Sequence, residues 1–156
     1  MIDDIILARS LHVLALVHWI GGVAFVTLVV LPLARSRSST TDAMALFNNV
    51  ERRFAVQVRV SIPLAGAAGL WMTYRMDLWE RFADPRFWWM PAMLGLWLVF
   101  MLMVFVLEPL LHARFEQLAL REPASTLRRM ARLHSLLLSL AALTLLGAVA
   151  GAHGFY

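Results

Sequence analysis

A long apolar run near the start of the chain restricts the fold more than any other feature of the sequence. It extends from Ile5 to Leu33, and its only ionisable side chains are Arg9, His12 and His18. Because ~20 apolar residues in a helix cross the hydrocarbon core of a bilayer, this run is long enough to span a membrane. The composition agrees, since 61% of the residues are hydrophobic and 15% are charged, which is too apolar for an ordinary soluble domain.

Three further apolar segments follow, so the sequence predicts an all-α, polytopic membrane protein that forms a single four-helix bundle over residues 1–156. The expected spans are residues 5–34, a surface helix plus second span at 43–75, and two more at 87–111 and 127–153. Apolar residues recur three and four apart over 43–59, which predicts an amphipathic helix at the membrane surface. We expect Asp42 to cap this helix and Ser125 or Thr126 to cap the last one.

The arginines predict the orientation. The connections after the first and third spans carry five each, against four on the opposite side, where five acidic residues accompany them. The positive-inside rule then places the arginine-rich side in the cytoplasm and both termini outside, which is the periplasm for a bacterial inner membrane. The net charge of +4 therefore does not indicate nucleic-acid binding, and the expected partner is the lipid bilayer. The first helix is interpreted as retained, because MIDDII lacks the positive start of a signal peptide.

Imidazoles inside a membrane span are costly and commonly mark a site. His12 lies in the outer third of the first span, His153 lies at a similar depth at the end of the fourth, and His18 lies two turns deeper. Six residues between His12 and His18 turn a helix by about 600°, so the two rings point about 120° apart and do not share one ion. Two sites at two depths, or one site with a spare histidine, are both open.

A haem held between two helices takes one imidazole from each, beside small residues that let the backbone approach. His12 opposite His153 meets the depth condition, and His18 with His134 or His112 is the other pairing. A hydrogen-bonded core histidine is the plainer interpretation of His12. The small residues expected beside His153 are Gly147, Gly151 and Gly154.

Two further groups of residues are candidates for an ion pair and for metal binding. Arg59 and Glu108 lie at similar depth near the arginine-rich edge, where an ion pair lowers the cost of holding both charges; a structural pair is favoured over a proton path. Glu108 and His112 share a helix face. The absence of cysteine excludes thiolate sites. Methionines of the third span do not converge, so core or lipid-facing roles are favoured over copper ligation (Met90, Met93, Met101 and Met103).

The first-helix pattern L-H-x6-W-x-G-G, with a proline closing the helix, resembles the CopD-like family of bacterial integral membrane proteins. The residues that carry it are Leu11, His12, Trp19, Gly21, Gly22 and Pro32. The pattern is also similar to the first helix of HemJ-type protoporphyrinogen oxidases. Weaker similarity extends to residues 51–54, 66–69 and 132–134. The first resemblance implies copper uptake across the inner membrane, and the second implies haem b bound through the histidine that matches His12.

These observations favour an inner-membrane protein that holds a redox metal centre, haem b, between the first and fourth helices. It would transfer electrons between a membrane quinol or radical and a periplasmic redox partner. His12 is the expected axial ligand, His153 or His18 the second, and Trp19 and Gly22 complete the cofactor-binding group. The alternatives are CopD-like copper uptake or delivery, and a cofactor-free structural or assembly subunit. Enzymatic activity and a homo-oligomeric state are left open.

Overall fold

The computed structural model describes residues 3–36 and 39–154 and, within them, the side chains of all residues except Thr40, His112 and Glu116. These residues form helices and no strand. Four helices are long and apolar enough to cross a membrane: Asp4–Arg35, Thr41–Arg75, Trp89–Leu111 and Pro123–Ala152. The expected all-α fold with four apolar spans is confirmed.

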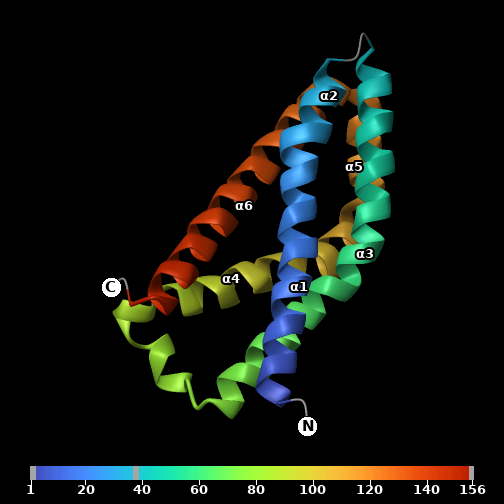
Figure 1. Ribbon diagram of the computed structural model, residues 1–156. Helices are drawn as coiled ribbons and strands as arrows, with labels where there is room; N and C mark the ends of the chain where they lie inside the picture. Colours follow the sequence, from blue (N-terminus) through green and yellow to red (C-terminus); the bar gives the residue numbers. More distant parts are fainter. Residues whose placement is uncertain (1–2, 37–38, 155–156) are drawn as a thin grey trace.

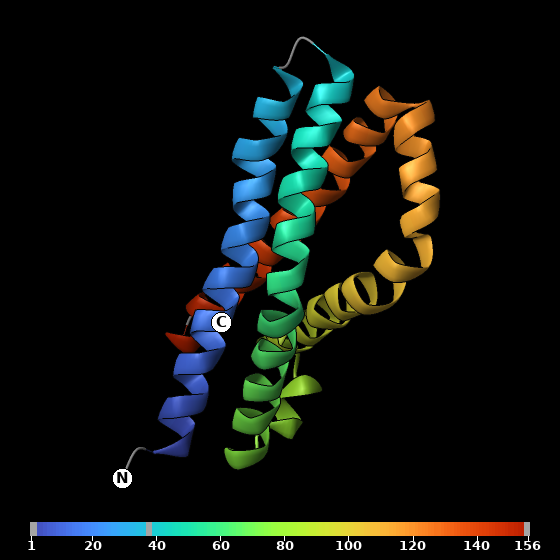
Figure 2. The same ribbon diagram turned by 90° about the vertical axis from the view of Figure 1, so that its right-hand side faces the viewer.

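The first two spans run side by side along most of their length (Figures 1 and 2). The first comprises α1 (Asp4–Phe25), a π-helical turn (Val26–Val30) and α2 (Leu31–Arg35). The second is the single helix α3 (Thr40–Arg75), which contains Pro63. Large apolar side chains cover their outer faces; Leu14, for example, is 65% exposed. A surface of this kind suits contact with lipid.

The third and fourth spans pack less closely against the first two. The third comprises α4 (Trp89–Leu102), a second π-helical turn (Met103–Leu107) and α5 (Glu108–Arg121). In Figure 1, α4 crosses behind α1 and α3, and Figure 2 shows α5 standing apart from them. The fourth span, α6 (Pro123–Ala152), meets α2 at the arginine-rich end and diverges from α1 toward its own C-terminal end. Short 3-10 turns, Trp79–Phe82 and Pro85–Phe87, connect the second span to the third.

Both π-helical turns directly precede a proline-containing turn of helix. Proline lacks an amide hydrogen, and its ring collides with the carbonyl four residues earlier in a regular α-helix. Pro32 and Pro109 are each the second residue of the segment after a π turn. Leu31 N–H accordingly bonds to the carbonyl of Val26, five residues back, and the wider turn relieves the crowding. The prolines therefore reshape these two spans without ending them.

The segment 43–59 is part of the single helix α3, which continues without a break into the second span. Met44 and Phe47 are buried against Val26, Leu31 and neighbouring side chains of α6. The apolar stripe is amphipathic, as the spacing indicated, but its partner is the protein. This arrangement buries the stripe within the bundle, where the first and fourth spans supply a matching apolar surface.

Several helix ends differ from the expected ones. Ser39, rather than Asp42, caps α3, because its side chain accepts a hydrogen bond from Asp42 N–H. The last helix begins at Pro123, four residues before the expected start, since proline suits the first turn of a helix. Ser125 donates to Glu122 instead of capping. The third apolar span ends at Leu111, as expected, and its helix continues as α5 to Arg121.

One carboxylate orders the connection between the second and third spans. Asp84 accepts hydrogen bonds from the backbone N–H of Arg86 and from its guanidinium. The guanidinium bonds, and then the backbone bond, hold the pKa of Asp84 below its usual value. The turn Pro85–Phe87 is thereby capped outside the membrane spans.

Glycines of the bundle receive aromatic rings from neighbouring helices. A Cβ on Gly66 would collide with the Trp97 ring, and one on Gly22 would collide with the Phe54 ring. Two glycines of α6 behave alike, since Gly147 faces Trp88 and Gly151 faces Trp89. These glycines therefore make room for aromatic side chains of neighbouring helices.

Adding one methyl group should separate filled from open glycine positions. Gly66→Ala would drive a Cβ into the Trp97 ring, which also donates to the Ile62 carbonyl, and should destabilise the protein by about 1 to 3 kcal/mol. Gly95→Ala is the matched control, because no atom lies within 4 Å of its Cβ position. Thermal unfolding of both variants in one detergent measures the difference. Equal melting temperatures for the two variants would contradict this packing.

Candidate functional site

His12 is fixed at the contact between α1 and α3. Its Nδ1 lies 2.7 Å from the carbonyl oxygen of Ala65. Because a carbonyl oxygen can only accept, Nδ1 donates, and in the neutral ring Nε2 then carries the lone pair. Gly69 provides the space, since its Cβ position lies 3.2 Å from His12 Cε1. A carbonyl that holds the second nitrogen in this way is the usual support of a metal-ligating histidine.

His18 has hydrogen-bond partners at both ring nitrogens. Nδ1 lies 3.1 Å from the Ser61 hydroxyl and Nε2 lies 3.1 Å from Gln57 Oε1. The amide oxygen accepts from Nε2–H, so Nδ1 accepts from the hydroxyl. A metal ion could bind only by displacing one of these partners. His18 therefore acts as a polar contact between α1 and α3, and its partners differ from that of His12.

A row of residues on α3 supplies all of these partners. Gln57, Ser61, Ala65 and Gly69 are spaced four residues apart and so lie along one face of the helix. This row was not predicted from the sequence. The sequence pattern that indicates it is a small or polar residue at every fourth position of α3, with larger apolar residues between.

The structure does not bring His153 to His12. His153 Nδ1 lies 2.8 Å from the carbonyl oxygen of Val149, one turn back in its own chain segment, and its side chain is exposed. Figure 1 shows the C-terminal end of α6 well apart from α1. Trp88 and Trp89 occupy the space at Gly147 and Gly151, whereas no atom lies within 4 Å of the Cβ position of Gly154. The side chains that meet this end of α6 are therefore these tryptophans.

His134 has partners other than His18. His134 Nδ1 bonds to the Met130 carbonyl of its own helix, and its ring meets Phe47 edge-on at 5.8 Å between centroids. The side chain of His112 lies outside the described residues. Within the described part of the chain, no three His, Asp or Glu side chains gather to hold a metal ion. His12 is thus the histidine whose geometry best fits a ligand.

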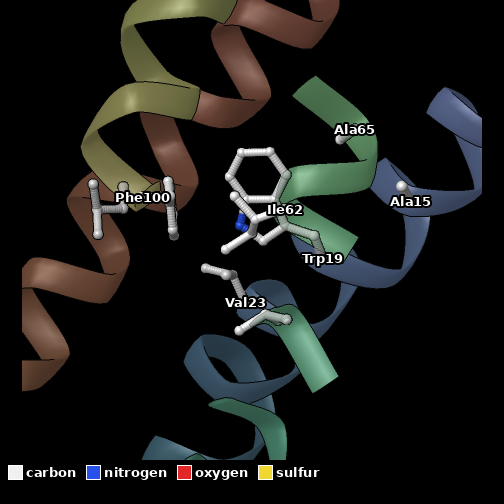
Figure 3. Close-up of a cluster of buried hydrophobic side chains, with 8 residues drawn as sticks. Ala15, Trp19, Val23, Ile62, Ala65 and Phe100 are labelled. Carbon is white, nitrogen blue, oxygen red and sulfur yellow. The ribbon is translucent and has the colours of Figure 1, made fainter. Parts of the chain in front are cut away.

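Trp19 and Gly22 have packing roles. Trp19 is 3% exposed within the apolar cluster in Figure 3, and its ring meets Phe100 edge-on at 4.8 Å between centroids. Its Nε1 has no hydrogen-bond partner among the described residues, a cost of about 1 to 3 kcal/mol. Gly22 makes room for the Phe54 ring. The structure gives no account of why a tryptophan with an unpaired N–H stands at position 19.

The ion pair expected between Arg59 and Glu108 is present. Arg59 Nη2 lies 2.5 Å from Glu108 Oε2, and the two side chains are 44% and 41% exposed. The pair joins α3 to the start of α5 near the arginine-rich end. At the opposite end Asp4 accepts from Arg75 and Trp71, which links the start of α1 to the end of α3. Both pairs hold neighbouring spans together.

Comparison with family models, curated proteins and solved structures finds no match for this chain. The class of protein is defined by the fold alone: an all-α, multi-pass membrane protein with four apolar spans. The resemblance of the first helix to CopD-like and HemJ-type proteins therefore rests on its sequence pattern alone.

A double-mutant cycle tests whether Arg59 and Glu108 stabilise the fold as a pair. Each side chain is about two-fifths exposed, so the coupling should be small, about 0.5 to 1 kcal/mol. Arg59→Gln and Glu108→Gln should each lower the melting temperature, and the double variant should lose less than the sum. Thermal unfolding in a constant detergent provides the measurement, and strictly additive losses would show that the pair contributes nothing.

Proposed function

We propose that this protein is a bacterial inner-membrane protein that holds haem b through His12 and takes part in electron transfer. The observation that carries the proposal is the hydrogen bond from His12 Nδ1 to the Ala65 carbonyl. It leaves Nε2 as the free electron-pair donor of a fixed ring inside a membrane span. The resemblance of the first helix to HemJ-type proteins supports the same ligand.

Haem is favoured over a bare copper ion by the number of ligands each requires. A porphyrin supplies four nitrogens itself, so a single histidine suffices to anchor the iron. A bare ion needs several protein ligands, and within the described residues no group of three His, Asp or Glu exists to provide them. Both nitrogens of His18 are engaged and His153 is exposed at the end of α6, so His12 is proposed as the sole histidine ligand.

The residues around His12 orient the ring. The Ala65 carbonyl holds the proton on Nδ1, which leaves the lone pair on Nε2. Gly69 allows the ring to lie close to α3. When bound, the haem supplies one-electron chemistry. The apolar outer faces of α1 and α3 keep water away from this level of the bundle.

The proposed orientation places His12 toward the periplasmic side. It follows from the arginines at the opposite end of the spans, which the positive-inside rule assigns to the cytoplasm. Electrons would then pass between a membrane quinol and a periplasmic redox partner. Fusing a reporter to the C-terminus and assaying its side of the membrane tests the orientation independently of the cofactor.

An absorption spectrum of the purified protein tests the haem proposal. Protein expressed with ample haem should show a Soret band that shifts on reduction with dithionite. His12→Ala should lose most of this band, because the porphyrin iron would lose its axial nitrogen. His153→Ala is the matched control and should keep it. A colourless wild-type protein, or an undiminished band in His12→Ala, would overturn the proposal.

Metal analysis of the same samples separates the alternatives. Stoichiometric copper without haem, lost in His12→Ala, would replace the proposal with CopD-like copper uptake or delivery. A protein that is colourless, free of metal and unaffected by His12→Ala would instead be a structural or assembly subunit of a membrane complex.

A further inference from the structure

A pocket opens at the arginine-rich end of the bundle, toward the other end of the first span from His12. Its volume is about 480 Å³, and it lies between the end of α2, the start of α3 and the start of α6. Its apolar wall is well packed: Ala34, Ala43 and Leu127 are all buried, at 5% exposure or less. One wall of the pocket is therefore formed by residues of the packed core.

Three arginines line this pocket: Arg35 from the end of α2, and Arg128 and Arg132 from α6. The latter two are four residues apart and so share a helix face. The ion pairs of the described residues join Arg59 to Glu108, Arg75 to Asp4 and Arg86 to Asp84, and none involves a pocket arginine. None of the described residues that line the pocket is acidic, so the pocket presents positive charge.

We propose that this pocket binds a phosphate group. Guanidinium groups match phosphate oxygens with paired, charge-assisted hydrogen bonds, and arginines from two helices can grip one phosphate from two sides. The buried wall beside them offers an apolar surface to the organic part of the ligand. A volume of about 480 Å³ is in the range that accepts drug-sized ligands, which is more than one inorganic phosphate ion needs.

The position favours the headgroup of an anionic phospholipid as the source of the phosphate. The pocket lies where the apolar spans Asp4–Arg35 and Pro123–Ala152 reach their arginine-rich ends. Basic pockets between membrane helices at this level are suited to anionic headgroups, whose own charge concentrates at the cytoplasmic surface. A soluble phosphate compound has the same chemistry, so the test must separate the two sources.

Native mass spectrometry of the full-length protein, released from detergent, measures the binding. Delipidated protein is mixed with phosphatidylglycerol, with phosphatidylcholine or with inorganic phosphate. Wild type should retain phosphatidylglycerol at least fivefold better than phosphatidylcholine. The double variant Arg128→Gln/Arg132→Gln should lose most of that preference. The matched control is Arg121→Gln/Arg129→Gln, which removes the same charge from residues that do not line the pocket and should stay within twofold of wild type.

The outcomes separate the ligands and stand apart from the haem proposal. Preference for phosphatidylglycerol that depends on Arg128 and Arg132 supports the lipid. Retention of inorganic phosphate with the same dependence, without lipid preference, supports a phosphate site with a soluble ligand. Equal retention of both lipids with no phosphate bound, or an equal loss in the control variant, overturns the proposal. The Soret band should be the same in both double variants, since neither alters His12.

Discussion

The contact between α1 and α3 is the interaction on which the rest of the structure depends. Hydrocarbon offers no hydrogen bonds, so polar groups within a span must find partners in the protein. His12 meets the Ala65 carbonyl, and His18 meets Ser61 and Gln57, all on one face of α3. These bonds fix the register of the two helices. A shift of one residue would leave the imidazoles unpaired in an apolar environment.

Aromatic rings set the positions of the other two spans. Trp97 of α4 occupies the space at Gly66 and donates to the Ile62 carbonyl, while Phe100 packs against Trp19. The Trp89 ring packs against α6 at Gly151. Because these rings occupy the space beside the glycines, aromatic side chains make the contacts between these helices.

The two ends of the bundle differ in chemistry. At one end the spans close with the linked charges of Asp4 and Arg75, and His12 lies on this side of α1. At the other end Arg35, Arg128 and Arg132 line an open pocket, and none of its described lining residues is acidic. The arginine asymmetry from which the orientation in the membrane is predicted thus coincides with a structural asymmetry, and the proposed haem and phosphate sites lie near opposite ends of the bundle.

The sequence by itself determined the four apolar spans, the helical class and the Arg59–Glu108 pair, because these follow from hydropathy and depth. Only the tertiary structure decided that Met44 and Phe47 pack against the first and fourth spans, that His12 and His18 bond to one face of α3, and that glycines admit tryptophans. Apolar stripes and glycines indicate that a helix surface will be buried, but they do not identify the residues that bury it. Those residues depend on how spans distant in the sequence cross, and this geometry cannot be derived from a single sequence.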